Sequence, residues 1–488
     1  MPTDSGPQLH LPGRGVDRRG RVRRSGRAGL DAAAVLIVLA WLYVIAPRLT
    51  QSLTAPKYRT AVGEPVPYSP QAAAVSYLTA LLLAGWCVLV VAQRLRELPG
   101  DRRRALVLLL APWVYLVCRD LYADTRPQVG TLLYPLAVVA LWVLRPRLER
   151  LSLLGYLVGL TAVLSVVLAT VRPDKGLLSA VSGQLVAPDK QILSSGILIG
   201  PFTDGNNLAQ FLVIGLPAIG LIRSHGWRFV VGAVTGYALV FTSSRSSLAA
   251  AAAAVLLALV LVLLPRRGRA VAAATALLAA SAAVVLLPLL ARGDAEFTNR
   301  GVIWRVGLQD WSTDPFFGLG SRYYLIIGQY ANPLGGNAFH GHNQLIQTLV
   351  TGGLIYLVLT VALIMTLAAA AVRWAGRGGS FPAVYLTAWL ISCVLEVSFG
   401  VVDRDFLFAV TVVPMAVLVF APVPAAQPAS TTPSSGAPTV RRAMTSSASR
   451  DRNRPRLSAT TTTPSTSRES ARPSATRNTG GAFSSTSG

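Results

Sequence analysis

Long apolar runs recur along the chain between residues 30 and 421. A helix of about 20 residues crosses the ~30 Å hydrocarbon core of a bilayer, and most of these runs approach that length. In lipid, backbone N–H and C=O groups must be bonded within their own segment, which favours helices. The pattern predicts an all-α polytopic membrane protein of about twelve transmembrane helices. The predicted spans are 30–46, 71–92, 104–118, 129–144, 151–171, 206–222, 227–242, 246–264, 270–290, 344–372, 381–400 and 405–421.

The connections between these spans differ in charge from one side to the other. If the N-terminus is cytoplasmic, every connection on that side is rich in arginine, whereas the opposite ones mix acids with bases, as around Glu64, Asp120–Asp124 and Asp403–Asp405. Basic connections remain in the cytoplasm. We therefore expect both chain ends inside the cell and the long connection 291–342 outside. The arginine-rich connections are 93–103, 145–150, 223–228, 265–269 and 373–379.

Two terminal segments lack the apolar residues that a folded core requires. Residues 1–29 carry a block of arginines and are predicted to form a disordered cytoplasmic arm. Residues 422–488 are rich in Ser, Thr, Pro and Arg and are predicted to form a disordered tail on the cytoplasmic side. The transmembrane domain then covers 30–421. Within it, the run 192–200 is too short to span, and we expect it to re-enter the membrane or to pack on its outer surface.

Composition agrees with a membrane protein. The chain has 488 residues, a mean hydropathy of +0.51 and only 14% charged residues. A net charge of +24 would suggest nucleic acid in a soluble chain, but these arginines lie in short connections and at the ends, so we expect no nucleic-acid partner. Cys87, Cys118 and Cys393 fall in apolar runs and are predicted to be packed thiols. We expect no cleavable signal peptide.

Three spans predicted to run inward begin with polar residues: Asp204–Asn207, Ser243–Ser247 and His340–Asn343. Each is a good N-cap sequence, which is the simpler interpretation. Alternatively, three helix N-termini at one membrane face would together favour a bound phosphate. Arg245 stands in the second of them. A guanidinium at a membrane edge usually marks a functional pathway, and its planar fork suits a diphosphate better than snorkelling to headgroups.

The stretch Thr298–Gly353 concentrates the polar chemistry of the chain. His340 and His342 are suited to exchange a proton near neutral pH, although a structural histidine bonded to a carbonyl is the alternative. The helix that follows carries a polar stripe at i, i+3, i+4 and i+7, which we expect to face the interior of the bundle. Its members are Gln344, Gln347, Thr348 and Thr351.

Other polar and aromatic residues have a simpler interpretation beside a functional one. Glu396 is an ionisable group within a predicted span, and we expect it to pair with an arginine such as Arg404. Metal-ligand spacings and phosphate-binding loop motifs are absent from the outer segments, so we expect neither a metal nor a nucleotide cofactor. The aromatic residues suited to stacking on sugars, or to anchoring at the interface, are Trp311, Tyr323, Tyr324 and Tyr330.

Four segments occur in a recognisable order: DGNNLAQFLVIGLPAIG (204–220), TSSRSSLAA (242–250), NRGVIWRVGLQDWSTDPFFGLGS (299–321) and HNQLIQTLVTGGLIYLVL (342–359). Together they resemble the bacterial O-antigen ligase and polymerase superfamily of membrane glycosyltransferases. The resemblance implies functional roles for Arg245, Arg300 and His342. It also implies metal-independent transfer outside the cytoplasmic membrane, from a glycan donor carried on undecaprenyl diphosphate to a glycan or cell-envelope acceptor.

Such a transfer needs a base for the acceptor hydroxyl and fixed positive charge for the departing diphosphate. We expect His342 to serve as the base, with Arg245 and Arg300 supplying the charge, while the His-x-His-Asn pattern leaves open which imidazole is essential. The residues expected to bind substrate are His340, Asn343, Asn206, Asn207, Arg305, Arg322 and Gln347.

The main alternative is a transporter or flippase of a lipid-linked or anionic substrate, which would also use arginines and helix ends within the membrane. A transporter should show inverted repeats and polar groups near the midplane, whereas here the polar groups collect at one face. Ligase and polymerase differ only in the acceptor, and the sequence does not separate them.

Overall fold

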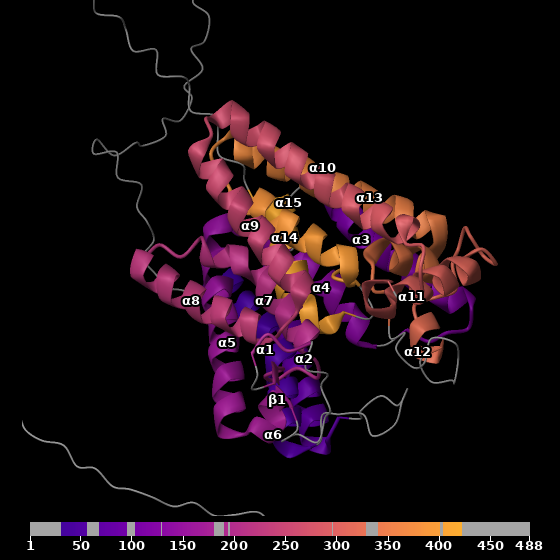
Figure 1. Cartoon of the computed structure of the whole chain (residues 1–488), viewed down its shortest axis with the longest axis horizontal. Helices are drawn as coiled ribbons and strands as arrows, with labels where there is room; N and C mark the ends of the chain where they lie inside the picture. Colours follow the sequence, from indigo (N-terminus) through magenta and orange to yellow (C-terminus); the bar gives the residue numbers. More distant parts are fainter. Residues whose placement is uncertain are drawn as a thin grey trace, which may run out of the picture. The chain divides into compact units, whose positions relative to one another are not determined.

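The computed structural model of the protein describes residues 31–55, 68–94, 103–127, 129–179, 190–193, 196–294, 296–327, 340–400 and 404–421. All of them belong to one compact unit. The predicted basic arm and tail lie outside the described residues. Helices dominate the described chain (Figure 1), and its strands are β1 (Leu177–Leu178) and β2 (Ile197–Leu198), which pair antiparallel.

Each range predicted to span contains a helix. In chain order the helices are α1 (Ala32–Thr54), α2 (Pro70–Gln93), α3 (Arg103–Tyr122), α4 (Leu133–Leu144), α5 (Ser152–Val171), α6 (Pro173–Gly176), α7 (Gly205–Ile219), α8 (His225–Phe241), α9 (Arg245–Leu263), α10 (Arg266–Leu290), α11 (Glu296–Trp311), α12 (Tyr323–Ile327), α13 (Gln344–Gly376), α14 (Phe381–Leu395) and α15 (Phe408–Phe420). Short 3-10 helices occupy Val129–Leu132, Leu148–Leu151 and Asp405–Leu407.

Among the described helices, seven are long and apolar enough to cross a membrane, and four further apolar helices are shorter. This confirms the all-α polytopic class, while the number of twelve spans stays a prediction. Helices α11 and α12 fold within the connection 291–342, which was predicted only as a loop.

Contacts between helix ends agree with the predicted alternation. Asp31 and Arg150, at two ends predicted to lie inside, form an ion pair of 2.7 Å. Arg48 and Asp405, at two ends predicted to lie outside, form another of 2.9 Å. Each of these two pairs joins helix ends that were predicted to lie on the same side of the membrane, and the topology as a whole stays a prediction.

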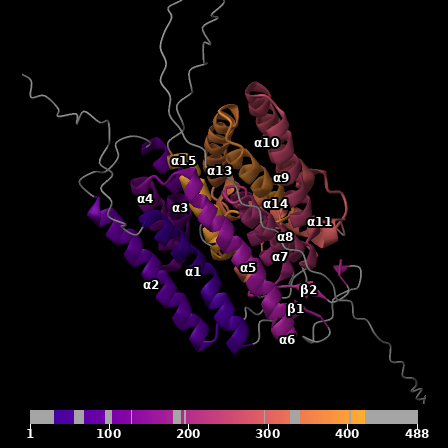
Figure 2. The same ribbon diagram turned by 90° about the vertical axis from the view of Figure 1, so that its left-hand side faces the viewer.

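Helices α7 and α14 lie inside the bundle, as does α15, because apolar side chains dominate their sequences. Nearly every residue of each is buried, and α14 packs against α7, α9, α10 and α13. In contrast, α1 and α2 lie side by side at the periphery (Figure 2), and α2 leaves much of its apolar surface exposed. Cys87 and Cys393 are buried as predicted, but the prediction for Cys118 is wrong because it lies on an exposed part of α3.

The short run 192–200 does not form a membrane segment in its described part. Ile197 and Leu198 form β2, and the N–H groups of Ile199 and Gly200 donate to the carbonyl of Gly176 at 3.0 and 3.2 Å. The run therefore packs against the end of α5 and α6.

Helix α13 is broken at Gly353, whose φ of 64° and ψ of −164° are non-helical. The loop between α11 and α12 docks into the break. The Leu319 N–H donates to the Val350 carbonyl at 2.7 Å, and the Leu354 N–H donates to the Pro315 carbonyl at 2.9 Å. The loop thus satisfies backbone groups that the break would otherwise leave unpaired. The sequence had predicted one continuous helix here.

The same loop is fastened to the end of α3. Arg119 donates to the Gly318 carbonyl at 2.5 Å, and the buried Asp120 carboxylate accepts from the backbone and the hydroxyl of Ser321 at 3.1 and 2.5 Å. Residues about 200 positions apart in sequence therefore fix the polar segment on top of α13.

Candidate active site

The start of α13 is fixed by its N-cap. The side chain of Asn343 accepts from the N–H groups of Leu345 and Ile346 at 2.8 and 3.1 Å, which satisfies two free donors of the first turn. Its amide nitrogen donates to the carbonyls of Val284 and Val394 at 3.0 and 2.9 Å. Asn343 was predicted to bind substrate, but its side-chain amide is already hydrogen-bonded to the first turn of α13 and to the carbonyls of α10 and α14.

The two histidines share a tight turn just before this cap. The backbone N–H of His342 donates to Nδ1 of His340 at 3.0 Å, and the two rings lie 3.9 Å apart. His342 has a left-handed φ of 46°. The Trp304 indole donates to the Gly341 carbonyl at 3.1 Å, and the Gly341 N–H donates to Gln347 Oε1 at 2.8 Å. These contacts hold both imidazoles at the N-terminus of α13.

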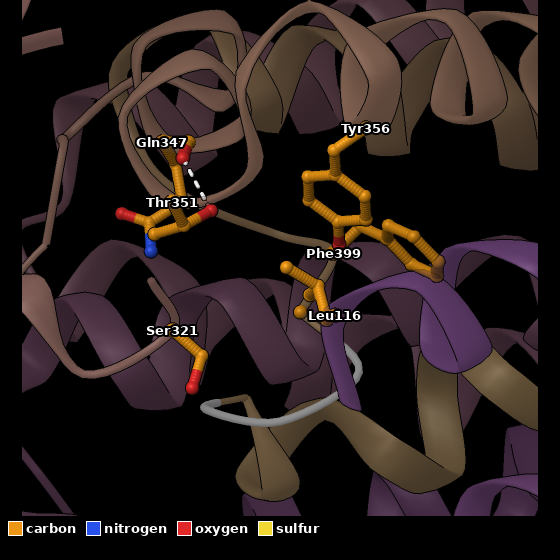
Figure 3. Close-up of a pocket in the computed structure, with 7 residues that line it drawn as sticks. Leu116, Ser321, Gln347, Thr351, Tyr356 and Phe399 are labelled. Carbon is orange, nitrogen blue, oxygen red and sulfur yellow. Dashed lines mark hydrogen bonds between the residues drawn. The ribbon is translucent and has the colours of Figure 1, made fainter. Parts of the chain in front are cut away.

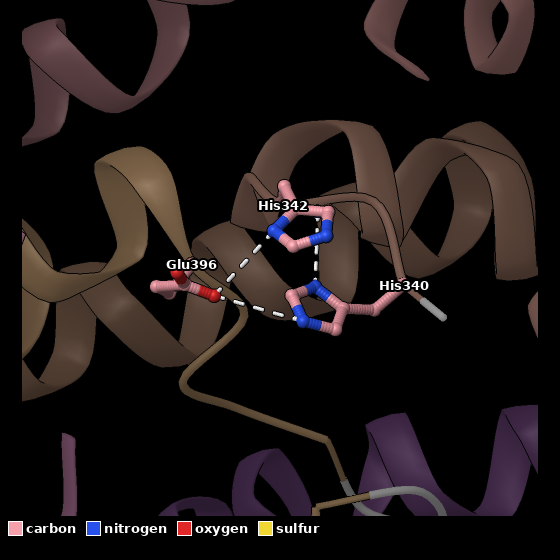
Figure 4. A group of neighbouring side chains, drawn as sticks. All are labelled: His340, His342 and Glu396. Carbon is pink, nitrogen blue, oxygen red and sulfur yellow. Dashed lines mark hydrogen bonds and ion pairs between the residues drawn. The ribbon is translucent and has the colours of Figure 1, made fainter. Parts of the chain in front are cut away.

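Arg300 and Glu396 complete the cluster with the histidines. Nη2 of Arg300 donates to Oε1 of Glu396 at 2.6 Å, and Nε of Arg300 lies 3.4 Å from Nδ1 of His342. Oε2 of Glu396 lies 3.6 Å from both Nε2 of His340 and Nδ1 of His342 (Figure 4). We call these four residues the His–Arg–Glu cluster. It unites α11, the turn before α13 and the end of α14.

Glu396 was predicted to pair with an arginine such as Arg404, and the structure shows an ion pair with Arg300. Arg300 donates a hydrogen bond to the carboxylate, and the charge of Arg404 also acts on it. Glu396 was expected to form a structural ion pair. An isolated acid at the end of an apolar span was the signal that could have marked it as functional.

The backbone immediately before Arg300 is strained. Phe297, Thr298 and Asn299 all have left-handed φ values, of 53°, 63° and 64°. Such conformations cost about 1–3 kcal/mol each and cluster at functional sites. They turn the chain so that the Phe297 carbonyl accepts from Nη1 of Arg300 at 3.3 Å.

Burial and charge act together on the ionisable groups of this region. Burial lowers the pKa of His340 well below its usual value, and the nearby positive charges of Arg404, His342 and Arg300 lower it further. His340 is therefore neutral at pH 7. Burial raises the pKa of Asp204, the N-cap of α7, and the charges of Glu396 and His342 act on it too. The start of α7 thus lies within electrostatic reach of the cluster.

His340, His342 and Glu396 each offer an atom to a metal ion, because these atoms lie within 4.8 Å of one another. Arg300, however, already bonds to the Glu396 carboxylate. A bound cation would face this fixed positive charge, which opposes metal binding at the carboxylate.

Arg245 lies at the first residue of α9 with its side chain exposed. The start of α7 adjoins this point, because a β-carbon on Gly205 would lie 2.9 Å from the Thr242 carbonyl oxygen. Ser244 stands at the N-cap of α9, within the predicted N-cap segment Ser243–Ser247, but its side chain accepts no capping hydrogen bond, and its hydroxyl contacts those of Ser246 and Ser247. Within the His–Arg–Glu cluster, Arg300 contacts both Glu396 and His342.

The other residues predicted to bind substrate are more scattered. Asn206 and Asn207 are half-buried in the first turn of α7. Arg305 points away from the cluster in an exposed pair with Asp294, at 2.7 Å. Arg322 is exposed before α12.

The polar stripe of α13 is buried as predicted. Gln347 and Thr351 line a small cavity of about 10 Å³ with Ser321 and Tyr356 (Figure 3), which is room for about one water. Of the aromatic candidates, Tyr324 is buried and Tyr323 contacts Asp310, whereas Trp311 is half-buried and Tyr330 lies outside the described residues.

Residues 230–361 match the protein family described as O-antigen ligase. The chain carries an O-antigen ligase domain. This domain reaches from α8 into α13 and contains Arg245, Arg300 and both histidines, but not Glu396. No curated protein matches the chain.

The O-antigen ligase domain confirms the superfamily that the sequence motifs indicated. Three of the four quoted segments fall within it, while 204–220 precedes it. Together with the apolar helices it identifies a multi-pass membrane protein of polysaccharide biosynthesis, of ligase or polymerase type.

Proposed function

We propose that the protein transfers or polymerises a glycan from an undecaprenyl-diphosphate carrier onto an acceptor hydroxyl, at the external face of the cytoplasmic membrane. The observation that carries the proposal is the junction of Arg300 with His342. These residues are 42 positions apart in sequence, yet Nε of one lies 3.4 Å from Nδ1 of the other. A proton acceptor and a fixed cation beside a helix N-terminus suit transfer from a diphosphate.

The reaction requires one bond to form and one to break. The acceptor oxygen attacks the anomeric carbon of the donor sugar, and the bond from this carbon to the diphosphate oxygen breaks. The electron pair leaves with undecaprenyl diphosphate, and His342 takes the acceptor proton. Positive charge near the leaving oxygen stabilises the transition state.

The two arginines have different environments and therefore different proposed roles. Arg245 is exposed at the start of α9 and is proposed to grip the diphosphate through its planar fork. Arg300 uses N–H groups at all three nitrogens for contacts with His342, Phe297 and Glu396. Since a guanidinium has five N–H donors, we propose that the other two, on Nη1 and Nη2, meet the diphosphate.

Metal independence is part of the proposal and is supported by the position of Arg300. Its guanidinium bonds to Glu396, so the positive charge needed beside the leaving diphosphate is already built into the protein. A divalent cation would repeat this function at the same carboxylate.

Replacement of His342 tests the proposal. His342→Ala should lower the turnover of lipid-linked glycan by about 10²- to 10⁴-fold, while binding of undecaprenyl diphosphate is largely retained. His225→Ala, in an exposed histidine at the start of α8, is the control and should leave turnover unchanged. Loss of binding with unchanged turnover of bound donor would refute the base role and favour the transporter.

A further inference from the structure

A single buried carboxylate connects the proposed base with the proposed cation. One oxygen of Glu396 accepts from Arg300 at 2.6 Å, and the other lies 3.6 Å from Nδ1 of His342. The Glu396 side chain is only 4% exposed. Replacing a buried ion pair by apolar residues is often neutral or stabilising, so such a pair is weak evidence of a stabilising role alone.

The backbone after Glu396 is fixed by amides from two neighbouring helices. Gln344 of α13 accepts from the Phe399 N–H at 2.9 Å and donates to the Phe399 carbonyl at 2.8 Å. Gln210 of α7 donates to the Val397 carbonyl at 3.4 Å. These contacts hold the extended segment after α14 against the first turn of α13. The carboxylate consequently has a defined position relative to His342.

We propose that Glu396 is a positioning residue for glycan transfer, which acts through His342 and stabilises the positive charge that His342 gains with the acceptor proton. The proposal rests on the proposed function of His342 as the base. The base is the His342 tautomer with its proton on Nδ1, which faces Oε2 of Glu396 at 3.6 Å, so that Nε2 carries the lone pair that takes the acceptor proton. In this tautomer Nδ1 does not accept from Nε of Arg300, 3.4 Å away. A carboxylate beside the imidazole nitrogen that does not react stabilises a protonated catalytic base in this way.

Other charged groups also face His342, and they differ from Glu396. Arg300 from α11 is a cation beside the ring and opposes a positive imidazole, and the charge of Arg404, ahead of α15, acts on Glu396 and His340. Asp204 at the start of α7 is an anion, but it is the N-cap of its own helix. His340 engages both ring nitrogens, since Nδ1 accepts from the His342 N–H and Nε2 faces Glu396. Glu396 is therefore the anion placed to stabilise protonated His342.

The test compares Glu396→Gln with the wild-type full-length protein, using lipid-linked glycan in membranes of cells that lack this protein. We expect kcat to fall by about 10²-fold or more, while KM for the donor and binding of undecaprenyl diphosphate change little. Asp405→Asn breaks the ion pair with Arg48 outside the cluster and should leave kcat unchanged. An unchanged kcat in E396Q would overturn the proposal.

A double-mutant cycle separates positioning from a merely structural role. If Glu396 acts through His342, then E396Q should cause little further loss in the His342→Ala background. Losses that multiply would overturn the proposal even when the single variant is impaired. If E396Q fails to accumulate, Glu396→Asp takes its place, with kcat expected to fall roughly tenfold or more while the donor KM is kept.

These outcomes are distinct from failure of the proposed function. A wild-type protein that transfers no glycan would refute the function itself, and this proposal with it. A wild-type protein that depends on His342 but not on Glu396 would refute only the positioning role.

Discussion

Gly353 lies so close to Phe316 that a β-carbon on the glycine would stand 2.3 Å from the Phe316 carbonyl oxygen. The left-handed φ of Gly353 and this approach together let the loop dock into the break of α13. Any side chain at this position would therefore strain the backbone and displace the loop.

We expect Gly353→Ala to lower the free energy of unfolding by roughly 2 kcal/mol or more. Thermal unfolding of the purified protein in detergent measures this change. Gly232→Ala is the matched control, because a β-carbon there meets nothing within 4 Å and helical alanine is favoured over glycine. Equal stability of the two variants would contradict the docking described for the loop.

Arg245→Lys should impair transfer although it keeps the charge. Lysine lacks the planar fork that suits a diphosphate, and loss of a charged hydrogen bond of ~1.5–3 kcal/mol corresponds to a roughly 10- to 100-fold lower kcat/KM. Steady-state kinetics with lipid-linked glycan measure this fall in kcat/KM. The comparison requires that the variant accumulate normally in the membrane. Arg266→Lys, in an exposed arginine that begins α10, should transfer as the wild type does. A wild-type rate for Arg245→Lys would remove the proposed grip.

The orientation of the chain is tested by reporter fusions. A reporter after Gly335 should behave as external and one after Gly268 as cytoplasmic, because arginine-rich connections remain inside. Phosphatase activity and fluorescence of the two fusions distinguish the compartments. The opposite pattern at both sites would move the His–Arg–Glu cluster to the cytoplasmic side and exclude transfer at the external face.

Transfer should continue in the presence of EDTA, since Arg300 supplies the positive charge that a metal would bring to Glu396. The rate is measured before and after chelation and again after Mg²⁺ or Mn²⁺ is added. Loss of activity that either ion restores would show that the metal-independent mechanism is wrong.

The sequence predicted the individual residues of the site better than the contacts between them. Asn343 was predicted as a helix cap and is one, because capping depends on a local side chain and the next three residues. Gln347 and Thr351 were predicted to face inward and are buried, because helical periodicity decides which residues share a face. Arg300 and His342 were expected to act together, whereas Glu396 was assigned to the wrong arginine.

By itself, the sequence determined the helical class, the apolar spans and the N-caps, since these follow from composition and from residues within a few positions of one another. Only the tertiary structure decided that Glu396 meets Arg300, 96 positions away in sequence, and that the loop ahead of α12 enters the break at Gly353. Such contacts depend on how helices that are distant in sequence pack against one another. Local sequence patterns alone are compatible with many different pairings of buried charges. The packing of α14 against α10 and α13 selects one of them and thereby places the carboxylate beside His342.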